Sequence, residues 1–226
     1  MTLRVYAFVS PAPAHLVAGV TGVEDEHLAL VRAQRIAAVV GACQSDPSTN
    51  AISRRALQRH DRVVRELARR AKAVVPARFG VHSGRAGDVR DFIRSRHGAL
   101  RSALELVCDR EQMTVRISRR KGTRPAPASG RKTAAGPGRT YLLSRVAQPL
   151  SVLPELSAAA ELWGAHVHAE RGHRPRQGPI LTIFHLIDRG TGTAYRGVLR
   201  EAAATVPHLE LHVSGPFPPY AFAPWL

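Results

Sequence analysis

The apolar and polar positions of the chain predict short strands near the amino end. Residues 3–9 are apolar on both faces of an extended chain, which is typical of a central strand. Residues 27–32 and 36–40 form a predicted hairpin around the segment 33–35, and the second of these strands is apolar throughout. The amino-terminal part of the chain is therefore expected to begin with a small sheet.

The longest predicted helix follows Asp46-Pro47-Ser48, a helix-start signal. Arginines surround its apolar stripe, and we interpret them as a solvated face, with a nucleic-acid-binding helix as the alternative. A histidine on such a stripe is expected to be a hydrogen-bonded core residue. The stripe consists of Ile52, Ala56, His60, Val63, Leu67 and Ala71.

A short strand at residues 73–75 leads into Pro76-Ala77-Arg78-Phe79-Gly80. Pro76 should end strand pairing at a sheet edge, and Gly80 permits a tight turn. If Arg78 is buried it needs a carboxylate partner, which Asp61 or a nearby helix could supply. Because neither a nucleophile nor a carboxylate pair accompanies Arg78, we expect a structural role for it rather than a catalytic one.

Beyond this turn, the pattern predicts two helices that break at His97-Gly98 and then an alternating strand at residues 113–117. We place a domain boundary just before that strand, which gives domains 1–108 and 109–226. Residues 119–138 are basic, lack acidic side chains and are rich in Pro, Gly, Ala, Ser and Thr. We expect them to form a disordered loop, either a tolerated insertion or an electrostatic tether for acidic partners.

The carboxyl-terminal half returns to ordered patterns. After a helix that starts at residues 142–146 and an apolar stripe from Leu153 to Val167, residues 180–187 read as a buried strand and residues 195–206 as a helix. With the strands at 113–117 and 208–213, the predicted order is strand, helix, strand, helix, strand. This order is compatible with a reduced form of the ferredoxin-like sheet, covered by helices on one face.

A proline- and aromatic-rich segment follows the last strand. The prolines fix φ and remove backbone donors, so we expect a stiff, extended segment that leaves the sheet. Its aromatic side chains either cap an apolar core or form a preorganised contact surface for another protein. The segment consists of Gly215, Pro216, Phe217, Pro218, Pro219, Tyr220, Ala221 and Phe222.

Composition narrows the possible classes. The chain has 226 residues, 44% of them hydrophobic, so it can bury substantial cores. It lacks an apolar run near the roughly 18 residues that a membrane span requires, so we expect a cytoplasmic location. Cys43 and Cys108 are too few for a disulfide framework and are expected to be buried thiols. The formal net charge of +16 would attract polyanions, including nucleic acids.

Motifs of common enzyme chemistry are missing from the sequence. It contains neither a phosphate-binding loop, a nucleophile elbow, His-Glu-x-x-His nor Cys-x-x-Cys. His166, His168 and His173 should diverge around a helix, so we expect them not to hold zinc. The glycine-rich residues 190–193 are expected to form a turn and helix cap. We therefore expect a protein without catalytic residues, cofactor or metal.

Several motifs resemble one known family. Gly215–Phe222 resembles the Gly-Pro-Trp-Pro-Pro-Tyr-Ser-Phe motif of the gas vesicle protein F/L family (GvpF/GvpL), with Phe217 and Ala221 replacing Trp and Ser. Residues 75–80 resemble its Leu-Pro-Met-Arg-Phe-Gly. His60-Asp61 stands where the family has His-Glu, and residues 138–142 resemble its Gly-x-x-Tyr-Leu. The pieces span nearly the whole chain.

The resemblance implies an α+β protein with an amino-terminal α+β domain and a carboxyl-terminal modified ferredoxin-like domain. It also implies an accessory protein, located at the gas vesicle or in the cytoplasm, that binds the small hydrophobic shell protein and other accessory proteins. Such a protein would help to nucleate or extend the vesicle wall and remain as a minor component. Thr182, His185 and Val81 depart from the residues usual in the family, so fine contacts at these positions should differ.

Two other functional classes stay open at this level. A basic nucleic-acid-binding protein would use the +16 charge and the basic loop. However, the aromatic residues are not interleaved with the basic runs, as stacking platforms would be. An enzyme with unrecognised chemistry would need a polar cleft lined by convergent titratable groups.

Overall fold

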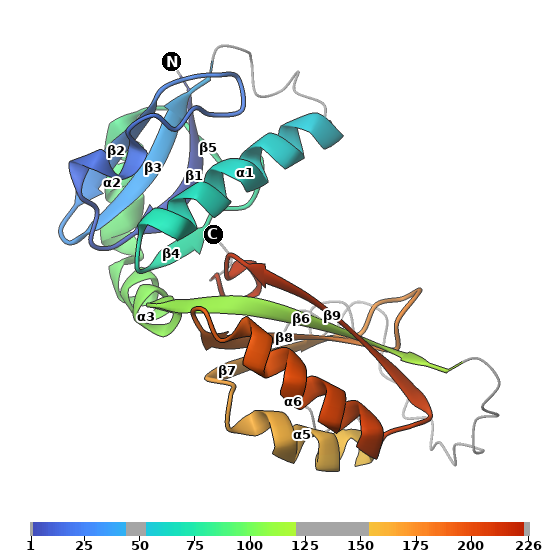
Figure 1. The fold of residues 1–226 in the computed structure, drawn as a ribbon. Coiled ribbons are helices and arrows are strands. Elements are labelled where there is room, and N and C mark those ends of the chain that lie inside the picture. The colour runs from blue at the N-terminus through green and yellow to red at the C-terminus, as the bar shows by residue number, and fades with distance from the viewer. Residues whose placement is uncertain (1, 44–52, 121–153, 224–226) are drawn as a thin grey trace, which may run out of the picture. The chain divides into compact units, whose positions relative to one another are not determined.

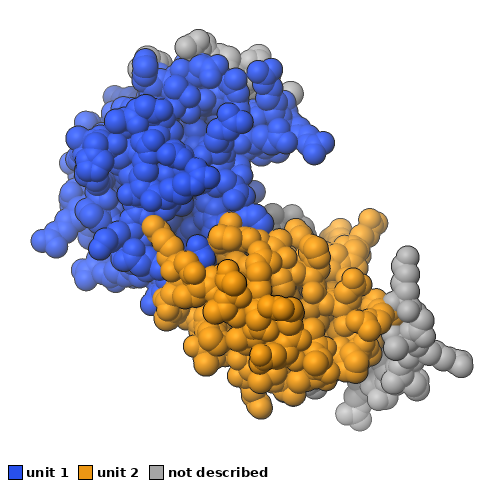
Figure 2. Space-filling view, in the orientation of Figure 1, with its two compact units in different colours: residues 1–111, 217–226 blue, residues 112–216 orange. Residues whose placement is uncertain are grey.

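The computed structural model describes residues 2–43, 53–120 and 154–223. The chain forms two compact units, residues 1–111 with 217–226 and residues 112–216, which Figure 2 shows in different colours. We call them the first and the second unit. The sequence places the division at residue 108/109 and assigns residues 217–223 to the second domain, whereas these residues pack within the first unit.

The first unit is built on a sheet around a central strand. The strands lie in the order β2 (Leu28–Ala33), β3 (Ile36–Ala42), β1 (Leu3–Val9) and β4 (Val74–Pro76). β5 (His82–Ser83) pairs with the same edge of β1 as β4, at the opposite end of that strand. All seven residues of β1 are buried, which confirms the predicted central strand.

Helices cover both faces of this sheet. α1 (Arg54–Arg70) lies on one face, where its Val63 and Leu67 share a core with Tyr6 of β1 (Figure 1). α2 (Ala86–Ser95) and α3 (His97–Val107) cover the opposite face, where Phe8 packs against Phe92 with ring centroids 5.7 Å apart. The 3-10 turn η1 (Ala14–Val17) closes the α1 side.

The start of α1 differs from the prediction. Ser53 is extended and its hydroxyl accepts a hydrogen bond from the Ala56 N–H at 3.1 Å, so it is the N-cap and the helix begins at Arg54. The predicted start signal at residues 46–48 lies outside the described residues. The predicted apolar stripe is confirmed from His60 to Ala71, where its residues are buried.

In its described residues, the second unit contains a four-stranded sheet covered by two helices. The strands lie in the order β7 (Ala169–His173), β8 (Leu181–Asp188), β6 (Arg110–Arg119) and β9 (Leu209–Phe217). α5 (Ser157–Gly164), after the 3-10 turn η3 (Pro154–Leu156), and α6 (Gly192–Thr205) lie side by side on one face (Figure 1). Trp163 and Tyr195 from these helices enter one core with Ile183 of β8.

Strand β7 corrects the predicted element order. Its sequence, Ala-Glu-Arg-Gly-His, carries neither β-branched nor aromatic residues, so periodicity did not indicate a strand. Pairing with β8 over five residues forms it, from Ala169 opposite Leu186 to His173 opposite Thr182. In the part of this unit that the structure describes, the order is therefore strand, helix, strand, strand, helix, strand. The expected basic loop at 119–138 and the helix at 142–146 lie outside the described residues, except for Arg119 and Arg120.

Within the described ranges, every helix is too short or too polar to cross a membrane. The final 3-10 turn, η4 (Tyr220–Phe222), belongs to the first unit and contacts β4 there.

Candidate functional site

The Pro76–Gly80 motif forms a loop anchored at both ends on β1. The Ala77 N–H donates to the Tyr6 carbonyl at 2.9 Å, and the Val5 N–H donates to the Val81 carbonyl at 3.0 Å. Between these anchors, Gly80 has a φ of 88°, a conformation that costs glycine little. The loop therefore connects β4 to β5, and both of its ends are hydrogen-bonded to β1.

Arg78 is exposed in this loop. A carboxylate partner was expected only if Arg78 were buried, so that expectation does not apply. Asp61, the expected partner, instead binds Arg65 and Tyr220. Phe79 packs edge-on against the His60 ring, with centroids 5.6 Å apart. The motif thus contributes a packing contact to the first unit through Phe79.

The carboxyl-terminal motif is a strand end followed by a turn, and not the extended segment that its prolines suggested. β9 continues through Gly215 and Pro216 to Phe217, and the chain then turns at Tyr220–Phe222. Phe222 is 1% exposed, and burying a phenylalanine stabilises a fold by about 2 kcal/mol. Phe222 therefore has the core-capping role that was one of the two alternatives for the aromatic residues.

Tyr220 and Phe217 lie against α1. The Tyr220 hydroxyl donates to an Asp61 carboxylate oxygen at 2.8 Å, while Arg65 donates to the other carboxylate oxygen at 2.5 Å. The Arg65 guanidinium carbon lies 5.1 Å from the centroid of the Phe217 ring, within the range of a cation–π contact. One ion pair on α1 thus contacts both Phe217 and Tyr220.

Tyr220 keeps its proton in this arrangement. Burial and the hydrogen bond to Asp61 raise the pKa of Tyr220 above its ordinary value. Nevertheless, 37% of Tyr220 is exposed, and so is 42% of Leu57, which lies one helical turn before Asp61 on α1. We call Leu57, Phe217 and Tyr220 the tail surface.

The first residue of the carboxyl-terminal motif, Gly215, is held by hydrogen bonds within the second unit. Arg196 of α6 donates to the carbonyls of Val213 at 3.3 Å and Gly215 at 2.7 Å. Gly215 has a φ of 126°, and a Cβ there would lie 2.9 Å from the Gln112 carbonyl oxygen. A side chain at this position would therefore strain the backbone and collide with the neighbouring strand.

His60 is the buried histidine of the first unit, as expected from its place on the stripe. It is 4% exposed, stacks on Tyr6 with centroids 5.1 Å apart, and its Nε2 lies 3.3 Å from the Ala77 carbonyl. Its Nδ1 is buried and has no hydrogen-bond partner among the described residues. Burial, with a smaller contribution from the positive charge of Arg4, lowers the pKa of His60 to about 4.

Four of the seven arginines of α1 form ion pairs within the first unit. Arg59 pairs with Asp25, and Glu66 binds Arg69 and Arg70 at 2.7 and 2.8 Å. These contacts support the interpretation of a solvated helix face, because the paired arginines are already neutralised by carboxylates.

Two buried polar networks were missed by sequence reasoning. In the first unit, Arg4 of β1 is 2% exposed and binds Glu24 at 2.7 Å and Glu26 at 3.4 Å. Tyr6 also donates to Glu26 and accepts from the Val23 N–H. An arginine within an otherwise apolar strand, together with a nearby acidic loop, is the signal that could have revealed this network.

The second network lies in the core of the second unit. The fully buried His185 bonds the Tyr195 hydroxyl through Nδ1 and Glu170 at 2.9 Å through Nε2. Burial raises the pKa of Tyr195. Since His185 and Tyr195 have no exposed surface, we assign this network to the architecture of the core and not to substrate binding.

Metal ligands do not gather in the described ranges, where no group of three or more His, Cys, Asp or Glu side chains could hold an ion. His168 pairs with Asp188 at 2.7 Å. Cys108 is exposed and Cys43 half-buried, so the expectation of two buried thiols is wrong for Cys108.

Comparisons with known proteins agree with these motifs. The family model "Gas vesicle synthesis protein GvpL/GvpF" matches residues 3–224. Gas vesicle protein L2 of Halobacterium salinarum is 26% identical over 94% of this chain and 87% of its own length.

Two solved structures share the fold. They are the gas vesicle protein GvpF of Anabaena sp. PCC7120, with a TM-score of 0.70, and that of Microcystis aeruginosa, with 0.72. Both are 14% identical to this chain and align over 99% of it, covering 96% and 99% of their own chains.

Proposed function

Because the chain belongs to the gas vesicle synthesis protein GvpL/GvpF family, we propose that it is a noncatalytic accessory protein of gas vesicle formation. In this proposal it binds the small hydrophobic shell protein and other accessory proteins, and helps to nucleate or extend the vesicle wall. It would associate with gas vesicles as a minor component.

We further propose that the two compact units act as two domains and that the second has a modified ferredoxin-like arrangement. The chain order β6, α5, β7, β8, α6, β9 supports this, since it is the strand–helix–strand–strand–helix–strand order of that fold. The sheet order, with β6 and β8 in the centre, supports it as well.

The observation that carries the binding proposal is the tail surface. In the described ranges, the large hydrophobic residues with the greatest exposure are Leu57, Leu162 and Tyr220, and two of these flank Asp61. Phe217 and Tyr220 are held by Arg65 and Asp61, so little side-chain entropy would be lost on binding. A rigid, partly apolar surface of this kind suits a partner whose apolar surface would otherwise aggregate.

Strand β9 offers a second contact. Among the described strands, it stands at the end of its sheet order. An edge strand can accept an added strand from a partner through main-chain hydrogen bonds. We propose that the shell protein pairs with β9 in the second unit, as a contact separate from the tail surface of the first unit, where Phe222 remains in the core.

The test is capture of the shell protein by purified variants. Truncation after Ser214 would remove the core residue Phe222, so point substitutions are more informative. The double variant Leu57→Ser/Tyr220→Ser should capture at least about tenfold less shell protein, since two partly apolar contacts are worth about 1.5 kcal/mol or more. Leu162→Ser on α5, 40% exposed in the wild type, is the matched control and should capture normally.

Tyr220→Phe separates binding from packing. It loses the hydrogen bond to Asp61 but keeps the aromatic ring, so it should retain most of the capture. Normal capture by a folded Leu57→Ser/Tyr220→Ser variant would contradict the assigned surface. If a host that lacks the gene for this protein still formed normal buoyant vesicles, the role in vesicle formation would be contradicted.

A further inference from the structure

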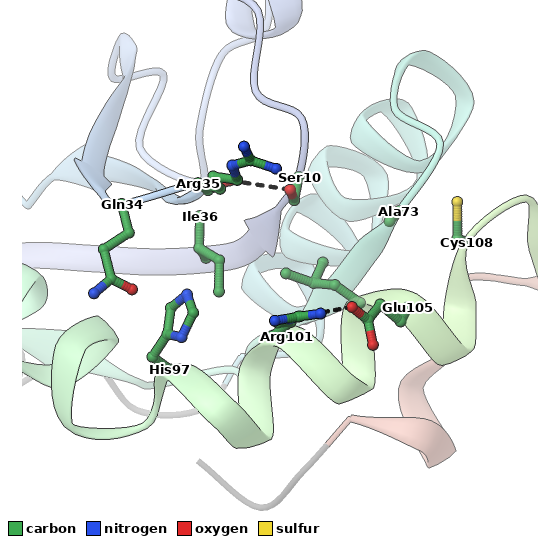
Figure 3. A pocket seen from close by; sticks show the side chains of 10 residues that line it. Ser10, Gln34, Arg35, Ile36, Ala73, His97, Arg101, Glu105 and Cys108 are labelled. Atoms are coloured by element: carbon green, nitrogen blue, oxygen red, sulfur yellow. Dashed lines mark hydrogen bonds and ion pairs between the residues drawn. The ribbon is translucent and has the colours of Figure 1, made fainter.

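A cavity of about 760 Å³ lies in the first unit, between the β2–β3 turn and α3 (Figure 3). Its volume falls within the range of ligand-binding sites. Ile36 and Leu104, both buried, contribute its apolar lining, and the exposed residues Gln34, Arg101 and Glu105 lie at its rim. The tail surface contributes none of the lining residues.

Polar side chains with free donors gather at one end of the cavity. Figure 3 shows Gln34, His97 and Arg101 around this end, next to Ile36. Arg101 uses its Nε to bind Glu105 at 2.7 Å, which leaves the terminal nitrogens of its guanidinium for a ligand. In the part of the chain that the structure describes, neither the Gln34 amide nor the His97 ring has a hydrogen-bond partner.

The backbone at Gln34 carries local strain. Gln34 has a φ of 54°, in the left-handed region, within the two-residue turn between the paired residues Ala33 and Ile36. Glycine or asparagine normally occupies such a position, and another residue costs about 1 kcal/mol there. A strained residue that breaks the local rule is typical of a functional site.

The chemistry of the site selects the ligand class. Gln34, His97 and Arg101 can all donate hydrogen bonds, and an arginine fork matches a carboxylate. The carboxylate of Glu105 beside Arg101 would repel a doubly charged phosphate and the consecutive phosphates of a nucleic acid. A singly charged carboxylate with an aliphatic neighbour fits this combination of donors and apolar lining.

We propose that this cavity binds a short acidic segment of a partner protein. A carboxylate of the segment lies against Gln34, His97 and Arg101, and an adjacent aliphatic side chain covers Ile36 and Leu104. The exposed rim allows a polypeptide to enter and leave the cavity, as a chain segment must. This site goes beyond the shell-protein surface and does not depend on it.

The experiment uses the full-length, ¹⁵N-labelled protein and two blocked peptides, acetyl-Leu-Glu-Leu-amide and acetyl-Leu-Gln-Leu-amide. We expect the Glu peptide to shift the amide resonances of Gln34, His97 and Arg101. The Gln peptide should bind roughly tenfold more weakly or worse, because it lacks the charge-assisted hydrogen bonds. Equal binding of the two peptides, or unchanged resonances at millimolar Glu peptide, would overturn the proposal.

Four variants sharpen the test. Arg101→Gln should weaken Glu-peptide binding roughly tenfold, whereas Arg94→Gln, which removes another exposed arginine of an ion pair, should leave it unchanged. Gln34→Gly should weaken binding and raise the melting temperature, since glycine relieves the strained φ. An equal loss in Arg94→Gln, or full binding by folded Arg101→Gln, would refute the site. Leu57→Ser/Tyr220→Ser should bind the peptide normally, which separates this site from the tail surface.

Discussion

Protonation of His60 should make the stability of the first unit depend on pH. The neutral ring is stacked on Tyr6 and faces Ala77 within the core, and burial lowers the pKa of His60 from 6.5 to about 4. In the unfolded chain the ring binds its proton at the ordinary pKa, so acid favours unfolding. The contribution of the neutral ring is fully present above pH 6.5, declines as the pH falls below that value, and is lost near pH 4.

The magnitude follows from the difference between the two pKa values. A shift from 6.5 to about 4 corresponds to about 3 kcal/mol over the whole window. Between pH 7 and pH 5, the same values give a loss of about 2 kcal/mol in the free energy of unfolding. Such a loss is a large fraction of the stability of a typical domain.

Urea unfolding at pH 7 and pH 5, followed by circular dichroism, measures this loss. Amide hydrogen exchange of β1 and α1 assigns it to the first unit. His60→Gln keeps a donor for the Ala77 carbonyl but does not titrate, so its loss between the two pH values should be smaller by about 2 kcal/mol. His27→Gln, at an exposed position, is the control and should behave as the wild type. Equal losses in wild type and His60→Gln would refute the reasoning.

Two further substitutions test the buried networks. Gly41→Ala places a Cβ 2.7 Å from the buried Glu26 side chain and should destabilise the protein by about 1–3 kcal/mol in urea unfolding. Gly98→Ala, in α3 with open space around it, is the counterpart and should be neutral or slightly stabilising; equal effects would show that Glu26 does not restrict the space at Gly41. Tyr195→Phe leaves His185 Nδ1 without its hydrogen bond and should cost about 1–3 kcal/mol, measured in the same way. An unchanged urea midpoint would mean that this hydrogen bond makes no net contribution to the free energy of unfolding.

Local periodicity was sufficient for the regular elements. Three elements could be predicted in this way: the apolar run of β1, the hairpin β2–β3 and the stripe of α1. Burial on one or two faces of an element determines the spacing of its apolar residues, which can be read in the sequence. The stripe also placed His60 in the core. The terminal motif indicated the family, although its conformation was predicted wrongly.

Elements that depend on pairing were not predictable in this way. β7 has an unremarkable polar sequence and becomes a strand only because β8 lies beside it. In the sequence, Arg65 is one of many arginines expected on a solvated helix face. In the structure it contacts Phe217, which lies 152 residues further along the chain. Spacing along a helix shows which side chains share a face, but it does not show which distant segment packs there.

The sequence by itself determined the classes of elements, the family and the burial of the main stripes, since these follow from propensity and from the spacing of apolar residues. Tertiary structure alone decided that the carboxyl-terminal residues return to the amino-terminal unit, where Asp61 binds both Tyr220 and Arg65. It also decided that Gln34, His97 and Arg101 surround one cavity. The physical reason is that hydrogen bonds and cavities depend on distances in space, which a linear pattern of residues does not contain.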